Sequence, residues 1–142
     1  QCATARDLAM TNKLNKTELE EGSELSVDYE KRGGLVPCIA QDVADGRVLM
    51  LGYVNQLALD TTFEKGMATF WSTSRKELWT KGETSGDFLK IEEVLIDCDQ
   101  DALIYRVAVQ GAGACHTKDP ESGVARKSCF YRIVEGQKLR FQ

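Results

Sequence analysis

The stretch LVPCIAQDVADGRVLMLGYVN, residues 35–55, carries the clearest fold signal in this chain. Two apolar runs flank Asp45-Gly46, and this dipeptide is typical of the tight turn between antiparallel strands. Asn55 follows the second run and can cap a helix that extends to about Lys65. The stretch therefore predicts a β-hairpin that leads directly into a helix.

Further runs rich in β-forming residues follow this helix, at residues 67–74, 88–99, 102–109 and 128–134. Roughly five strands with one or two helices, without regular alternation of strand and helix, predict an α+β fold with an antiparallel-rich sheet. The polar residues 1–34 are predicted to form a lead-in that is helical or partly ordered. Residues 35–142 are predicted to form the main domain.

Composition narrows the possible classes of function. The chain has 142 residues, of which 42% are hydrophobic and 28% charged, and no apolar run approaches the ~20 residues that span a bilayer. A formal net charge of −4 argues against a nucleic-acid partner, because phosphates favour a basic surface. The five cysteines are an odd number, which favours reduced thiols. We therefore expect a cytoplasmic protein without a nucleic-acid or membrane partner.

Acidic side chains interrupt the apolar run VLIDCDQDALIY, residues 94–105. In an extended strand Asp97, Asp99 and Asp101 would share one face, and Cys98 would point to the other. Three neighbouring carboxylates repel one another unless they are neutralised, and clustered oxygen ligands suit Mg²⁺ or Ca²⁺. The alternative is a solvated strand end whose acids face water.

Thiols and the only histidine gather in the C-terminal third of the chain, at Cys98, Cys115, His116 and Cys129. Thiolate and imidazole are the usual zinc ligands, and three protein ligands leave a fourth position for water, as in catalytic zinc sites. The gaps between these residues are wide, so the cysteines could instead be small buried hydrophobic residues. With the acidic cluster, they indicate a metal-dependent hydrolase in which His116 carries protons.

The segments MLGYVN, TFWSTSRKELWTKGETSG, DCDQDALIYRV, ACHT and SCFYR lie in this order within residues 35–132. Together they closely resemble the phosphoribosyl-AMP cyclohydrolase family. The resemblance implies hydrolysis of the N1–C6 bond of the adenine ring in phosphoribosyl-AMP, the third step of histidine biosynthesis, by residues 35–142. It also implies a homodimer that shares zinc ligands between its chains, with a zinc-activated water and with magnesium assisting substrate binding.

The resemblance also implies roles for single residues. By position, Cys98, Cys115 and Cys129 match the zinc ligands. By the same matching, Asp97, Asp99 and Asp101 correspond to the magnesium ligands. His116, which follows the second zinc cysteine, is the candidate catalytic residue. The other two cysteines, Cys2 and Cys38, match no ligand position, so we expect them to be structural.

A substrate cradle is expected in the segments FWSTSR and WTKGETSG, with the candidate residues Trp71, Arg75, Trp79, Lys81, Glu83 and Ser85. Arg75 and Lys81 can pair with phosphate, and Trp71 or Trp79 can stack on a purine. The alternative is that both tryptophans are core or interface residues and that the two cations are ordinary surface charges.

The chain departs from the family pattern between its last two cysteines. The family usually has a compact C-H-T-G-x-x-S-C loop, whereas here Lys118 replaces the glycine and the loop is about seven residues longer, which adds little closure entropy. We expect an exposed excursion whose base still closes on zinc through Cys129. Two other functions remain open, a non-catalytic zinc-stabilised binding module and a hydrolase that acts on another purine nucleotide.

Overall fold

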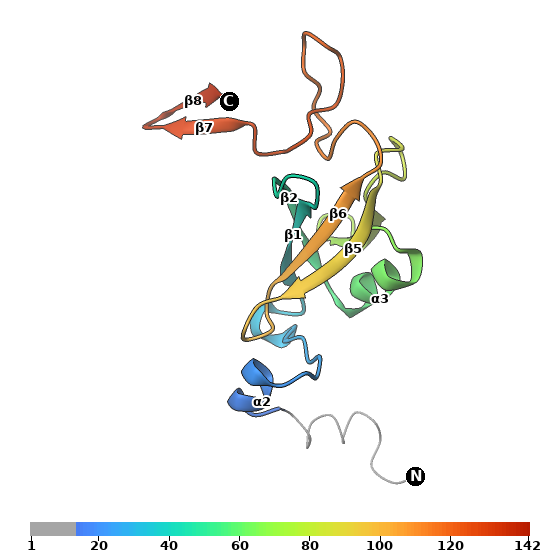
Figure 1. The fold of residues 1–142 in the computed structure, drawn as a ribbon, viewed down its shortest axis with the longest axis vertical. Helices are drawn as coiled ribbons and strands as arrows, with labels where there is room; N and C mark the ends of the chain where they lie inside the picture. The colour runs from blue at the N-terminus through green and yellow to red at the C-terminus, as the bar shows by residue number, and fades with distance from the viewer. Residues whose placement is uncertain (1–13) are drawn as a thin grey trace.

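The computed structural model describes residues 14–142, which form an α+β fold with antiparallel-rich sheets (Figure 1). Within this range the elements are α2 (Lys16–Glu21), the 3-10 helix η1 (Glu30–Arg32), β1 (Val36–Asp42), β2 (Val48–Val54), α3 (Gln56–Lys65), β3 (Thr69–Ser72), β4 (Glu77–Thr80), β5 (Leu89–Ile96), β6 (Leu103–Val109), β7 (Arg132–Glu135) and β8 (Lys138–Phe141). The predicted fold class is confirmed. The positions of Cys2 and of the lead-in before residue 14 lie outside the described residues.

The central sheet has the strand order β2-β1-β6-β5. It consists of two antiparallel hairpins, β1–β2 and β5–β6, joined through a parallel pairing of β1 with β6. The first hairpin turns at Asp45-Gly46, as predicted. The parallel pairing joins Ala40 to Tyr105, which are far apart in sequence, and local sequence patterns do not report such a contact.

One face of this sheet forms the core. Alternate residues of β1 and β6 are fully or almost fully buried, namely Val36, Cys38, Ala40, Leu103, Tyr105 and Val107. Helix α3 packs nearby through Leu59 and Thr62, and the Thr62 hydroxyl lies 3.1 Å from the Tyr105 hydroxyl. Cys38 is therefore a core residue, in line with the structural role that we expected for it.

Helix α3 has the predicted boundaries. The Asn55 side chain accepts a hydrogen bond of 2.9 Å from the Ala58 backbone N–H at its start. At its end Gly66 adopts φ 71°, a left-handed conformation that glycine tolerates without steric cost. A small second sheet of β3 and β4 follows, in which Phe70 packs on Trp79 with ring centroids 5.3 Å apart.

The strand predicted for residues 88–99 is too long. Strand β5 ends at Ile96, and residues 97–102 form the turn of the β5–β6 hairpin. The reason is that the Asp97 carboxylate accepts backbone hydrogen bonds from Asp101 and Ala102, which replaces strand pairing with a side-chain-closed turn. The alternation that put Asp97, Asp99 and Asp101 on one face of a strand is therefore wrong, although the three residues do cluster.

The C-terminal strand is shorter than predicted, because β7 begins at Arg132 and Cys129 lies in the preceding loop. The sequence also gave no indication of β4 or β8, which have four residues each. The β7–β8 hairpin projects away from the central sheet (Figure 1). Among residues 14–142, no helix is long and apolar enough to cross a membrane.

Candidate active site

Two of the three predicted zinc cysteines lie side by side. Cys115 follows β6, and its backbone N–H donates to the Arg126 carbonyl at 3.1 Å. Cys129 is attached to the other hairpin, because its backbone N–H donates to the Leu49 carbonyl of β2 at 2.7 Å. The neighbouring Ser128 hydroxyl donates to the Val48 carbonyl at 2.7 Å. These backbone bonds anchor Cys129 to the central sheet and Cys115 to the loop that precedes Cys129.

The longer loop between these cysteines folds back on itself. Lys118 pairs with Ala125 as an antiparallel bridge, and the Asp119 N–H donates to the Val124 carbonyl at 2.9 Å. Gly123, at φ 71°, occupies the left-handed conformation that this turn requires. The excursion is thus a small hairpin with a hydrogen-bonded base, which keeps Cys115 and Cys129 together despite the added residues.

The two thiols influence each other electrostatically. Burial raises the pKa of Cys115, but hydrogen bonds from the Thr117 hydroxyl (2.9 Å) and the Thr117 backbone N–H outweigh it, so the net pKa is lowered. Burial and the negative charge of Cys115 raise the pKa of Cys129 to about 11, while Lys81 acts in the opposite direction. The pair therefore favours one thiolate, and a bound cation would allow both sulfurs to ionise.

A cavity of about 770 Å³ opens beside the thiol pair. It gathers most of the predicted site, namely Arg75, Trp79, Lys81, Glu83, Ser85, Cys115, His116 and Cys129. The Lys81 side chain is notable because the residue is only 9% exposed and forms no ion pair within residues 14–142. Trp71 lies outside this cavity, in a depression of about 300 Å³ that Arg75 and Trp79 also line.

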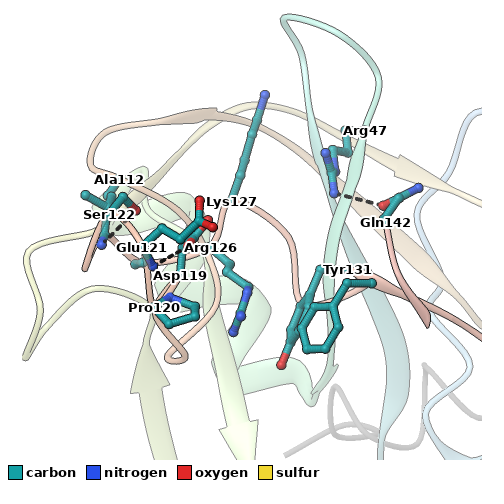
Figure 2. A pocket seen from close by; sticks show the side chains of 13 residues that line it. Arg47, Ala112, Asp119, Pro120, Glu121, Ser122, Arg126, Lys127, Tyr131 and Gln142 are labelled. Atoms are coloured by element: carbon teal, nitrogen blue, oxygen red, sulfur yellow. Dashed lines mark hydrogen bonds between the residues drawn. The ribbon is translucent and has the colours of Figure 1, made fainter. Parts of the chain in front are cut away.

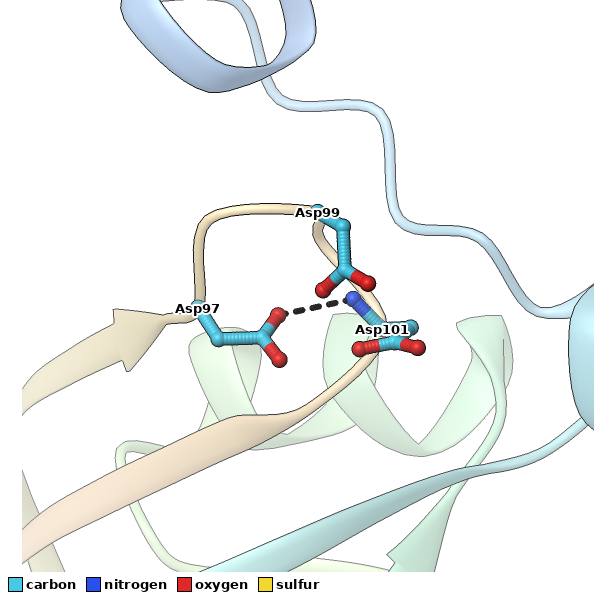
Figure 3. A group of neighbouring side chains, drawn as sticks. All are labelled: Asp97, Asp99 and Asp101. Carbon is cyan, nitrogen blue, oxygen red and sulfur yellow. Dashed lines mark hydrogen bonds between the residues drawn. The ribbon is translucent and has the colours of Figure 1, made fainter. Parts of the chain in front are cut away.

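The aspartates form a second cluster, in the β5–β6 turn (Figure 3). One oxygen from each of Asp97, Asp99 and Asp101 lies within 4.8 Å of the others. Burial raises the pKa of Asp97. Hydrogen bonds from Arg32 and Lys31 hold the pKa of Asp101 far below its usual range. The turn therefore carries concentrated negative charge, which cations of the N-terminal segment partly neutralise.

The N-terminal segment, residues 14–34, is bonded to this turn through Gln100. The sequence did not indicate this role. Gln100 adopts φ 57° and is 5% exposed. Its side-chain amide donates to the Leu19 and Glu24 carbonyls and accepts from the Ser26 N–H at 2.6 Å, while its own carbonyl accepts from Asp28. A glutamine within an acidic run gives no sequence signal for such a role.

Cys98, the third predicted zinc cysteine, is exposed in the aspartate turn. The seven residues of β6 separate this turn from the segment that carries Cys115, which corresponds to roughly 20 Å of extended strand. Sulfur ligands of one zinc lie within about 4 Å of each other, since each Zn–S bond is about 2.3 Å. A single chain therefore does not bring Cys98 together with Cys115 and Cys129.

A second cavity of about 770 Å³ lies between the excursion and the C-terminal hairpin (Figure 2). Its cations are engaged within the chain. Arg47 bonds Gln142 at 3.3 Å, Arg126 stacks 4.1 Å from the ring centre of Tyr131, and Lys127 forms ion pairs of 2.8 Å with two aspartates at the β1–β2 turn. None of the predicted site residues lines this cavity, so we place the candidate active site in the thiol-lined cavity.

A pair of adjacent thiols, of which Cys115 is buried and Cys129 exposed, lies beside a histidine in a cavity with cationic side chains. This arrangement is typical of a metal-dependent hydrolase with an anionic substrate. The family model for phosphoribosyl-AMP cyclohydrolase matches residues 50–131, which include this cavity's thiols and histidine. That match covers more than half of the chain. The chain belongs to the phosphoribosyl-AMP cyclohydrolase family.

Similar proteins agree with this membership. The chain is 48% identical over 115 residues to "Phosphoribosyl-AMP cyclohydrolase" of Desulfatibacillum aliphaticivorans, covering 81% of this chain and 86% of that protein. It is 46% identical over 128 residues to the protein of the same name from Hyphomonas neptunium, covering 90% and 91%. "Histidine biosynthesis bifunctional protein HisIE" of Aquifex aeolicus is 47% identical over 106 residues, which are 75% of this chain and 48% of that protein.

Proposed function

We propose that this chain hydrolyses the N1–C6 bond of the adenine ring in phosphoribosyl-AMP, as a step of histidine biosynthesis. In this reaction the oxygen of water adds to C6, the C6–N1 bond breaks, and N1 gains a proton, so the ring opens to a carboxamide. The observation that carries the proposal is the cavity that unites Cys115, Cys129 and His116 with the cations Arg75 and Lys81. Family membership supports the same reaction.

Zinc fits the thiol pair chemically. Two adjacent sulfurs, one with a lowered pKa, are donors that zinc prefers, and Cys98 of a second copy would complete a three-sulfur set. Zinc held by these residues would lower the pKa of a bound water molecule and so supply the nucleophile. A cytoplasmic location suits the proposal, because thiols stay reduced in that compartment.

A homodimer is supported by two features. Cys98 lies too far from the thiol pair of its own chain, and it is exposed and accessible to another copy. The C-terminal region also exposes large apolar side chains, namely Phe130, Val134, Leu139 and Phe141, which are between 54% and 75% exposed. Apolar surface of this kind is typical of an interface that a second subunit buries.

Magnesium fits the aspartate turn, since three carboxylate oxygens within 4.8 Å are suitable ligands for a hard cation. In the proposed dimer, the ligand Cys98 would bring its flanking aspartates close to the partner's thiol pair. Asp97, Asp99 and Asp101 would then hold magnesium where it assists binding of the substrate phosphates. The same strand turn would serve two different metals.

The protein side chains have distinct proposed tasks in the cavity. His116 is exposed on the cavity wall beside Cys115 and can transfer a proton to N1 as the ring opens. Arg75 and Lys81 can bind phosphate, and Trp79 offers an aromatic surface for the purine, although it also packs on Phe70. Glu83 and Ser85, on the adjoining turn, can bind substrate hydroxyls, and Trp71 lies in the neighbouring depression.

An ultraviolet assay of ring opening tests the proposal directly. Zinc-loaded protein is expected to convert phosphoribosyl-AMP, and a zinc chelator should abolish turnover, with recovery on readdition of zinc. Absence of turnover by the zinc-loaded protein would contradict the assignment. A protein that binds zinc with four saturated ligands and shows no activity would instead be a zinc-stabilised binding module.

A further inference from the structure

The Lys31 side chain binds carboxylates of the aspartate turn. Its ammonium lies 2.6 Å from Asp101 Oδ2 and 3.0 Å from Asp99 Oδ2, so it bonds two of the three clustered carboxylates. Arg32 approaches from beside it and bonds only Asp101, at 2.6 Å. The Asp101 side chain is 5% exposed, whereas that of Lys31 is 46% exposed. A half-exposed cation of the chain therefore contacts a buried carboxylate.

An ammonium and a divalent cation cannot bind the same carboxylate oxygens at the same time. Magnesium needs oxygen ligands at about 2.1 Å in nearly octahedral geometry. A lysine ammonium within hydrogen-bonding distance of Asp99 and Asp101 uses the same lone pairs and repels a second cation placed a few ångströms away. We propose that Lys31 and a divalent cation compete for the aspartate turn, so that metal binding displaces the Lys31 ammonium. This inference rests on the magnesium site of the proposed function.

Backbone hydrogen bonds around Lys31 keep its side chain close to the aspartates. The Lys31 N–H donates to Asp28 Oδ1 at 3.1 Å, and the Asp28 N–H donates to the Gln100 carbonyl at 2.8 Å. These bonds fix the main chain to the turn itself while the lysine side chain can still swing toward solvent. A tethered competitor acts at a high effective concentration, which lowers the apparent affinity for metal whether or not substrate is present.

Calorimetric titration of the zinc-loaded, substrate-free protein with MgCl₂ measures this competition. Lys31→Met is expected to tighten magnesium binding by about twofold to fivefold, the size of effect typical of removing an exposed ion-paired charge. Lys31→Arg, which retains the charge, should bind magnesium much as the unaltered protein does. Lys138→Met is the matched control, because Lys138 is exposed on β8 and forms no ion pair within residues 14–142.

Manganese electron paramagnetic resonance provides a second readout, the number of metal ions bound per chain. Adding Asp99→Asn to Lys31→Met should weaken the binding again and so place the ion at the aspartates. Equal or weaker magnesium binding by Lys31→Met would overturn the proposal, as would binding that Asp99→Asn leaves unchanged. Ring opening by the unaltered protein is measured separately, so failure of the competition and failure of the proposed reaction are distinguishable.

Discussion

Two clusters of side chains lie near the two ends of β6, aspartates at one end and thiols at the other, and the chain builds them in different ways. At its start, the aspartate turn is complete within one chain, closed by the Asp97 side chain and partly neutralised by Lys31 and Arg32. At its end, Cys115 and Cys129 lie together, but the third matching thiol is about the length of the strand away. Packing within one chain therefore organises the carboxylates, whereas in the proposed dimer a second copy would complete the thiols.

The largest expected effect is at the thiol end. Cys115→Ala should remove bound zinc and lower ring-opening activity at least about a thousandfold, because one ligand of three is lost. Zinc content by metal analysis and the ultraviolet assay are measured on the same preparation. Cys38→Ala is the control, since this thiol is fully buried in the core and lines neither large cavity. Zinc retention by Cys115→Ala would remove Cys115 from the ligand set.

Subunit mixing tests directly whether the thiol site is shared. Cys98→Ala and Cys115→Ala should each be inactive alone, yet an equimolar mixture that exchanges subunits should recover about a quarter of full activity. Half of the dimers would be mixed, and each mixed dimer would contain one intact site. Mixing Cys115→Ala with Cys129→Ala is the matched control and should recover nothing, since both ligands come from the same side. A shared site would be contradicted if the control mixture recovered activity. It would also be contradicted if the mixture of Cys98→Ala with Cys115→Ala recovered none.

The features that the sequence could predict depend on residues close to one another in the chain. The Asp45-Gly46 turn, the two strands beside it and the Asn55 cap are local properties, and the structure has them as expected. The substrate cradle and thiol pair followed from residue-by-residue matching, and one cavity gathers most of those residues.

What could not be predicted depends on contacts between distant segments. Lys31 meets Asp101, and Gln100 meets Ser26, across some seventy intervening residues. The parallel pairing of β1 with β6 has the same character. The alternating pattern predicts a strand at Asp97, because it does not reveal that this carboxylate accepts a hydrogen bond from the backbone four residues later.

A smaller effect is expected at the carboxylate end. Asp99→Asn should keep zinc but weaken magnesium binding by roughly tenfold to a hundredfold, because a neutral amide replaces one anionic ligand. The measurements are zinc content and the magnesium concentration that gives half-maximal activity. Asp119→Asn is the control, since Asp119 is an exposed acid at the base of the excursion turn. Full activity of Asp99→Asn at low magnesium would mean that the aspartate turn does not serve that ion.

The smallest effect concerns the contact between the N-terminal segment and the aspartate turn. Gln100→Ala removes side-chain hydrogen bonds to Leu19, Glu24 and Ser26, so we expect a loss of about 1–3 kcal/mol in the free energy of unfolding. Denaturant titration measures this loss, and Gln110→Ala, at an exposed position, is the control.

Zinc content should change little in Gln100→Ala, because Cys115 and Cys129 are anchored to β2 and to the excursion, and only the ligand Cys98 lies in the loosened turn. A stability equal to that of the control would show that these bonds do not hold the turn. A loss of zinc would show that the conformation of the aspartate turn controls the ligand Cys98, so the carboxylate cluster and the thiol site would not be independent of each other.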